Sequence, residues 1–194
     1  RNVAIGHRAG ELIKTGNNNT YIGGYRTGYY NHAGTSNIGI GNSAIGADAN
    51  TYVNELVAVG VAAGALTAGN VGDTDGNVYV GYNAGYANIS GSGLTMLGFK
   101  AGQNATGSYN TFLGYQTGQG YAGAAATTGG KNTAIGYQSM QVFTSGNSNV
   151  AMGYTALPAL TTGIGNIAIG SRASLVHTTG QYNVVIGEGA MRDT

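Results

Sequence analysis

Few side chains in this 194-residue chain are acids, histidines or cysteines, the types that most often act in catalysis or bind metal ions. Acid, base or metal catalysis needs several titratable groups that converge on one place. No two of the acids and histidines occupy matching positions in neighbouring copies of the sequence repeat described below. We therefore expect no enzyme active site, no cofactor and no metal ion. The residues concerned are Glu11, Asp48, Glu55, Asp73, Asp75, Glu188, Asp193, His7, His32 and His177.

One short stretch, Asp73-Thr74-Asp75-Gly76, resembles part of a calcium-binding loop. Alternating carboxylates before a glycine can wrap a hard cation. The later bidentate acid that completes such a loop is missing from the sequence. We interpret the stretch as a solvated turn.

Half of the eight basic residues share one position of the repeat, once the inserted Gly24 is allowed for: Arg8, Arg26, Lys100 and Arg172. This basic column has two interpretations, a polar stripe that binds an anionic glycan or simply a solvated edge. We keep its members as surface candidates for ligand binding and regard the solvated edge as the simpler interpretation. With a net charge of +1 and no basic tail, the chain is not expected to bind nucleic acid.

The elements that must position these side chains come from an internal repeat. Its most regular feature is a glycine that recurs at intervals of 16 to 22 residues. Repetition at a short period is typical of solenoids. The eleven copies are centred on Gly6, Gly23, Gly41, Gly60, Gly81, Gly98, Gly114, Gly136, Gly153, Gly170 and Gly187.

Two columns of the repeat predict a short strand before each glycine. The third residue before it is always β-branched, which suits a strand, and the residue just before it is always aliphatic or Met. These two columns lie two residues apart, so they share one face of the strand. We predict that this face forms the interior, and that the uncharged residue between them faces a partner. The aliphatic column consists of Ile5, Ile22, Ile40, Val59, Val80, Leu97, Leu113, Ile135, Met152, Ile169 and Ile186.

The segments after the glycine also repeat. The third residue beyond it is nearly always Ala, Ser or Thr, which predicts a crowded line at a corner or an axis. A Thr-Gly or related pair often precedes the next strand, and we predict a second, weaker strand and a turn there. Three longer connectors, at 46–55, 65–76 and 119–131, are expected to form loops on one face.

Together these features predict a single all-β domain spanning residues 1–194, a parallel β-solenoid of about eleven coils and roughly 50 Å. No apolar run approaches the ~18 residues of a membrane-spanning helix, and no signal peptide opens the chain. Neither end supplies the polar cap that a solenoid needs, so we expect a segment of a longer fibre. The sequence has no Cys, and a coil with few large side chains has a thin core, so we expect the chain to associate with copies of itself.

The run Asn132-Thr133-Ala134-Ile135-Gly136, with its ten variants, resembles the head repeats of trimeric autotransporter adhesins and the repetitive shaft of phage tail fibres. The resemblance implies a homotrimer of left-handed parallel β-rolls, with apolar columns inside each roll and small residues near the threefold axis. It also implies attachment to a glycan or protein receptor on a host cell, without catalysis or membrane insertion. The expected location is the virion; the alternative is the bacterial cell surface, as the head of an adhesin that binds host matrix or another surface.

An aromatic residue follows the glycine in five consecutive copies, as in the tail-fibre version of the repeat: Tyr82, Phe99, Tyr115, Tyr137 and Tyr154. Parallel stacking would place these rings ~4.8 Å apart. Such a column could stack sugar rings, or it could line the seam between neighbouring chains. Phe99 has no hydroxyl, so the sequence favours the seam.

Overall fold

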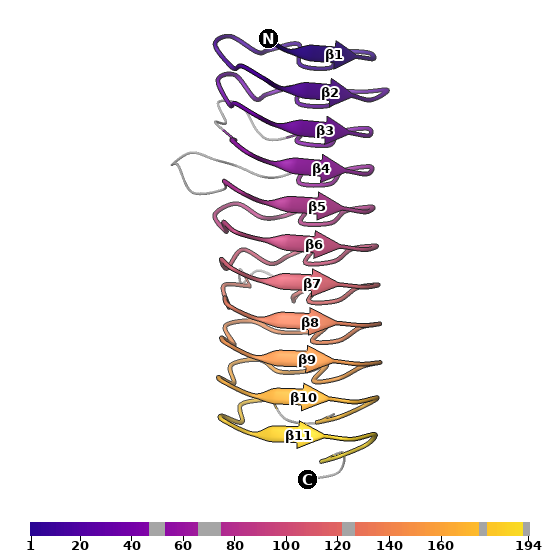
Figure 1. Cartoon of the computed structure of the whole chain (residues 1–194), viewed down its shortest axis with the longest axis vertical. Coiled ribbons are helices and arrows are strands. Elements are labelled where there is room, and N and C mark those ends of the chain that lie inside the picture. The colour runs from indigo at the N-terminus through magenta and orange to yellow at the C-terminus, as the bar shows by residue number, and fades with distance from the viewer. Residues whose placement is uncertain (47–52, 66–74, 122–126, 175–177, 192–194) are drawn as a thin grey trace.

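The computed structural model describes residues 1–46, 53–65, 75–121, 127–174 and 178–191. One parallel sheet runs along the whole rod, with its strands stacked in chain order (Figure 1). The described residues contain no helix, so the predicted all-β parallel solenoid is confirmed. Its strands are β1 (Val3–Ile5), β2 (Thr20–Ile22), β3 (Ile38–Ile40), β4 (Val57–Val59), β5 (Val78–Val80), β6 (Thr95–Leu97), β7 (Thr111–Leu113), β8 (Thr133–Ile135), β9 (Val150–Met152), β10 (Ile167–Ile169) and β11 (Val184–Ile186).

The register of the sheet follows the sequence repeat. Thr133 pairs with Val150, and Ile135 pairs with Met152. The pairing of Val57 with Val78 is equally regular, although 21 residues separate them. Changes in the length of a repeat are therefore absorbed between strands and never shift the sheet.

The predicted second strand does not form in the described residues. Turns and bends follow each glycine instead, with only two isolated bridges, Ala105 to Thr127 and Asn147 to Ile164. Single backbone hydrogen bonds still join the coils there, such as the one that the Gly118 amide donates to the Ser139 carbonyl at 3.0 Å. The predicted loops at 46–55 and 65–76 lie largely outside the described residues, as does the middle part, 122–126, of the predicted loop at 119–131.

The strand faces are the reverse of the sequence prediction. The central residue of the strand is buried in every coil from β2 to β11, as Tyr21, Tyr79 and Ala134 illustrate. The aliphatic column points outward, and Ile5, at 57% exposed, is typical of its more open members. The two outer columns do share one face, as expected, but the connector closes each coil on the opposite side of the strand. An apolar side chain is no proof of burial, and here the central residue is the one enclosed, whether it is large like Tyr79 or small like Ala134.

The small residues three places beyond the glycine are also inside the chain. Ala44, Ala84 and Ala156 are completely buried and belong to the same apolar cluster as the central column. The prediction that such residues lie near a threefold axis is therefore wrong, because they line the interior of a single coil. A small side chain is needed there since the strand and the returning connector approach each other closely.

In most coils the interior is filled by complementary pairs of side chains. Opposite the large central residue Phe112 stands Gly118, where an added Cβ would lie 2.4 Å from the ring. In β8 the sizes are exchanged, because small Ala134 shares its coil with buried Met140. The same exchange relates the coil of Tyr79 and Gly85 to that of Ala151 and Leu157. These coils thus keep about the same filled volume, whereas the coil of β4 has small residues, Ala58 and Gly64, at both positions.

A ladder of buried asparagines runs beside the strands. The amide nitrogen of Asn149 donates to the side-chain oxygen of Asn132 at 3.1 Å and to the carbonyl of Gly163 at 2.9 Å. Its own side-chain oxygen accepts hydrogen bonds from the backbone and side chain of Asn166. The buried side-chain amide of Asn149 is therefore hydrogen-bonded to the asparagines of the neighbouring coils and to a backbone carbonyl in a turn. Buried polar groups need such partners, which explains the asparagine before so many strands.

Candidate interaction surface

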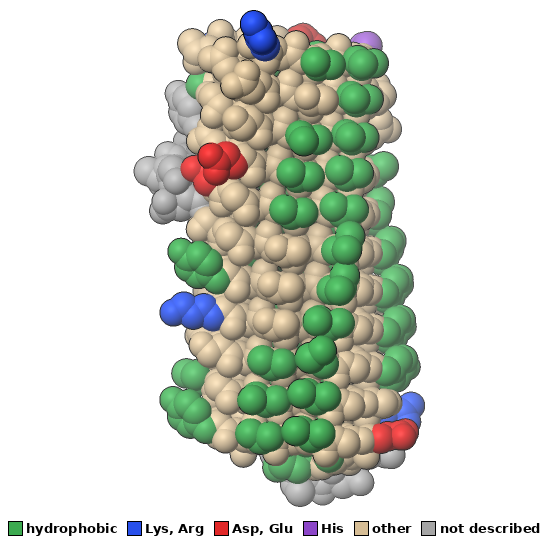
Figure 2. All heavy atoms as spheres, in the orientation of Figure 1, with side chains coloured by type: hydrophobic (Ala, Val, Ile, Leu, Met, Phe, Trp, Pro, Cys, Tyr) green, Lys and Arg blue, Asp and Glu red, His purple; other side chains and the backbone are tan. Residues whose placement is uncertain are grey.

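The two outer columns of the sheet together make an extended apolar face on the outside of the rod. Figure 2 shows hydrophobic side chains in regular columns along the rod. None of the residues in these columns is charged. Its most exposed members reach 65% at Val184 and 67% at Ile186, while others such as Ile135 are half-buried. We call this surface the apolar face; an extended apolar patch of this kind is typical of an interaction site.

The aromatic ladder, Tyr82, Phe99, Tyr115, Tyr137 and Tyr154, follows the apolar face after the glycine that ends each strand. Successive ring centroids lie 5.0–5.3 Å apart, with planes within 14° of parallel. The predicted stacking is therefore confirmed. All five side chains remain partly open to solvent.

The geometry of the ladder limits what it can bind. Each inner ring has a neighbouring ring against both of its faces, so no inner face is open for a sugar. Only ring edges and hydroxyls point outward. Edges of this kind suit packing against another apolar surface, with the hydroxyls left in water.

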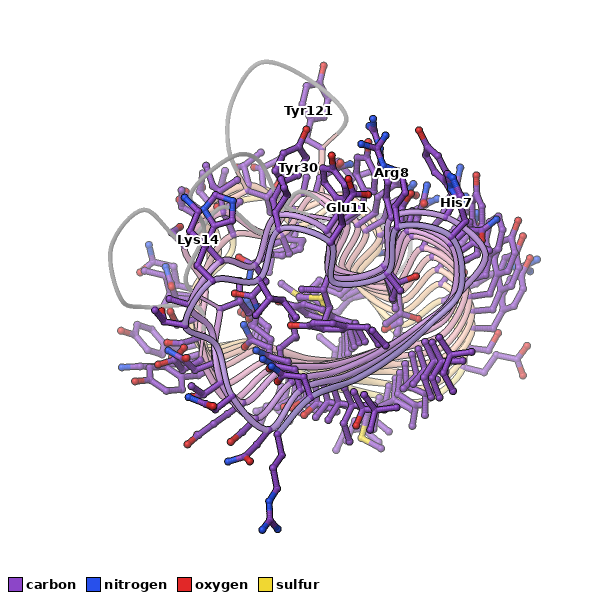
Figure 3. All side chains as sticks on the ribbon, turned by 90° about the horizontal axis from the view of Figure 1, so that it is seen from above. His7, Arg8, Glu11, Lys14, Tyr30 and Tyr121 are labelled. Carbon is purple, nitrogen blue, oxygen red and sulfur yellow. The ribbon has the colours of Figure 1, made fainter. Side chains whose placement is uncertain are left out.

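The basic column is engaged mainly with its own chain at the upper end of the rod. Arg8 makes an ion pair with Glu11 at 2.5 Å and donates to the Tyr29 hydroxyl at 2.8 Å. Figure 3 shows Arg8 and Glu11 side by side on one flank of the coil. The hydrogen bond with Arg8 lowers the pKa of Glu11. Arg26 lies between Tyr25 and Tyr29, with its guanidinium carbon 5.0 Å from each ring centroid.

The other two members of the basic column lie far from this pair. Lys100 belongs to the coil of β6 and has its ammonium 5.4 Å from the centroid of Phe99. Arg172 belongs to the coil of β10 and lies over Tyr154 at 5.8 Å. The four candidates therefore share a register, but the structure does not bring them together into one charged patch. Their contacts with rings support the aromatic ladder and its neighbours.

The sequence did not single out the amide contacts between these cations. Gln138 donates to Gln116 at 2.8 Å, and Gln119 donates to Gln103 at 2.9 Å. Each pair joins matching positions of two successive coils, but only Gln116 and Gln138 share the register of the basic column. The matching positions of Gln116 and Gln138 in the repeat were the signal that could have found the first pair.

The titratable groups do not assemble a reaction centre within the described residues. No group of three or more acids and histidines there is placed to hold a metal ion. Asp75 accepts a hydrogen bond from the backbone of Asn54 at 3.2 Å; Asp48, Asp73, Asp193 and His177 lie outside the described residues.

The most perturbed groups in the interior are core tyrosines. Burial raises the pKa of Tyr21 to about 12 and raises that of Tyr79 further. Asn31 and Asn88 donate hydrogen bonds to the two hydroxyl oxygens. These contacts satisfy buried polar atoms and offer no open site.

Comparison with known proteins adds no relative: no family model, no curated protein and no solved structure matches the chain. Among the described residues, no helix is long and apolar enough to span a membrane.

Proposed function

We propose that this chain is a structural and receptor-binding segment of a homotrimeric phage or phage-like tail fibre, which attaches to the surface of a host cell. The observation that carries the proposal is the apolar face, which extends over all eleven strands without a charged residue. The first and last strands, β1 and β11, lie at opposite ends of the rod (Figure 1). A long, uniform rod with an apolar face along one side is suited to assembly into a fibre.

The occupant of the apolar face is further copies of the same chain. Every coil presents the same pair of outward columns at a fixed register. A parallel copy in the same register therefore meets an equivalent surface along the entire rod. Burying apolar area contributes roughly 25 cal/mol per Å², so a face of this length gives ample driving force. The choice of three copies rests on the likeness of the repeat to trimeric fibres and adhesins.

The assembly is tested by light scattering on the purified chain. We expect the mass of a trimer at micromolar concentration. A double substitution on the apolar face, Leu97→Asp with Leu113→Asp, should lower the mass to that of one chain. The matched control, Ser90→Asp with Ser145→Asp, alters exposed positions away from the strands and should leave the trimer intact. A wild-type monomer would refute the assembly.

Attachment is tested separately with fluorescently labelled trimer on bacterial cells. We expect saturable binding that unlabelled trimer displaces. Periodate treatment of the cells removes binding to a glycan receptor, whereas protease treatment removes binding to a protein receptor. Absence of binding to any bacterial host would contradict the receptor-binding role but leave the trimer standing.

The second candidate is the head of a bacterial trimeric adhesin. The same repeat and the same apolar face support it, because both groups share this motif. Saturable binding to immobilised extracellular-matrix protein, without binding to bacterial cells, would favour the adhesin.

A further inference from the structure

We propose that Tyr115, Tyr137 and Tyr154 form a site of oxidative cross-linking, where Tyr137 couples with a neighbouring tyrosine to give a dityrosine bond between successive coils. The oxidant is hydrogen peroxide, used by a haem peroxidase. The proposal goes beyond attachment and does not depend on it, because both coupling partners belong to one chain.

The three rings are already arranged as pairs. The centroids of Tyr115 and Tyr137 lie 5.2 Å apart with an angle of 4° between the ring planes, and those of Tyr137 and Tyr154 lie 5.2 Å apart with an angle of 6°. The paired strands fix this register, since Leu113 pairs with Ile135 and Ile135 with Met152. The backbone therefore already holds the partners in place, and coupling requires the side chains to rotate until the ring edges meet.

The rings are also accessible. Between 42% and 49% of each of the three tyrosines is exposed. Within the described residues their hydroxyls take part in no hydrogen bond. A phenol that loses an electron can therefore pass its proton directly to water.

The reaction balances with one peroxide per bond. Each phenol loses one electron and one proton to become a phenoxyl radical, with unpaired spin on the carbons ortho to oxygen. Two radicals join through a new carbon–carbon bond between ortho carbons, and the displaced ring protons return to the oxygens as the rings regain aromaticity. Overall, two phenols and one hydrogen peroxide give one dityrosine and two waters.

The sequence of the ladder sets which pairs react. Phe99 lies between Tyr82 and Tyr115 and has no phenol to oxidise, so Tyr82 is excluded from coupling along the ladder. The guanidinium of Arg172 lies 5.8 Å from the Tyr154 centroid, and its positive charge opposes removal of an electron from that ring. Tyr115 with Tyr137 is therefore the preferred pair.

The test treats the whole purified chain with peroxidase and hydrogen peroxide. We expect dityrosine fluorescence and a product that still migrates as a single chain on a denaturing gel. Trypsin separates Tyr115, in the peptide 101–131, from Tyr137, in the peptide 132–172. Mass spectrometry should find these two peptides joined, with the loss of two hydrogens.

Three variants make the assignment specific. Tyr137→Phe removes the shared partner and should abolish the linked peptides, because Tyr115 and Tyr154 are two coils apart. Phe99→Tyr fills the gap in the ladder and should raise the yield and add links through position 99. The control, Tyr109→Phe, alters an exposed tyrosine that packs on Gly93 and is not stacked on another ring, so the yield should not change.

Two results would overturn the proposal. One is equal dityrosine in Tyr137→Phe, with links mapped elsewhere, such as the perpendicular pair of Tyr29 and Tyr30. The other is an absence of dityrosine in the wild-type chain under conditions that couple free tyrosine completely. Circular dichroism of Tyr137→Phe, expected to match the wild type, ensures that a lost bond reports chemistry and not unfolding.

Discussion

Ala134 shows how a small side chain can determine the inside of this fold. It is fully buried, while its larger neighbour Ile135 is partly exposed. The connector returns on the side of Ala134, so that side alone is shielded from water. The same order of burial holds at Ala151 and Ala168.

Ala134→Asp should therefore unfold the chain, whereas Ile135→Asp should not. A carboxylate at position 134 would be buried without a partner, at a cost of several kcal/mol. At position 135 it would lie on the apolar face, where it disrupts contacts between chains. Circular dichroism should show loss of the β spectrum only for Ala134→Asp, and light scattering should show loss of mass for Ile135→Asp. A folded Ala134→Asp beside an unfolded Ile135→Asp would contradict this order of burial.

The buried tyrosines should make the fold sensitive to high pH. Burial raises the pKa of Tyr21 and Tyr79 above the unfolded value of about 10. Their stabilising contribution is fully present below about pH 10 and is lost as the pH rises toward the folded pKa. The melting temperature of the wild type should fall above about pH 10, and less steeply in Tyr79→Phe.

The comparison that matters is the slope of melting temperature against pH. Tyr79→Phe also loses the hydrogen bond from Asn88, which should cost about 1 kcal/mol at neutral pH. The control Tyr182→Phe alters a tyrosine that is 75% exposed and should keep the wild-type slope. Parallel curves for all three proteins would rule out ionisation of Tyr79 as a cause.

At the scale of the element, most coils are filled by two side chains of complementary volume. A large central residue faces a glycine, as at Phe112 and Gly118, and a small one faces a large side chain, as at Ala134 and Met140. The residue that faces the central one has a positive φ in both arrangements, at Gly118 as well as at Met140, where φ is 49°. The backbone thus stays the same while the side chains exchange size.

This exchange predicts rescue in a double mutant. Phe112→Ala should cost about 3–5 kcal/mol through the cavity it leaves, and Gly118→Met should clash with the ring. Together they recreate the pair found in β8, so the double mutant should be more stable than the sum of the single changes predicts. Denaturant titration of the four proteins should give a favourable coupling of about 1–3 kcal/mol. Simple additivity would show that the two positions do not share one volume.

The sequence was sufficient to locate every strand, but not to orient it. All eleven predicted strand positions occur in the sheet, because the glycine and the β-branched column mark them. Both sets of alternating residues are uncharged, so polarity could not distinguish inside from outside. Stacking of the ladder followed directly from the repeat. The sequence also places Arg8 and Arg26 in coils far from those of Lys100 and Arg172. The groups that each cation contacts depend on side-chain packing, which the repeat does not predict.

At the scale of the molecule, the rod is a one-dimensional stack. Each strand contacts only the strands before and after it, and the asparagine ladder passes hydrogen bonds between adjacent coils. Stability in such a stack is close to a sum of contributions from coils and their neighbours. Inner coils gain support from both sides, whereas β1 and β11 gain it from one.

Amide hydrogen exchange should reveal this gradient. We expect slow exchange in β6 to β9 and faster exchange in β1 and β11, because end coils open without disturbing the rest. Mass spectrometry of deuterated peptides can measure it. Uniform protection along the rod would instead indicate that the chain opens only as a whole.

The constancy of register between repeats of unequal length has a practical consequence. The rod lengthens by one strand spacing for each repeat glycine, whatever the number of residues in the repeat. Intervals of 16 and 22 residues between successive glycines produce the same single step of the sheet. Foreign peptides grafted into a connector should leave the pitch of the rod unaltered, so the molecule is a natural ruler on which binding groups can be displayed at regular, chosen intervals.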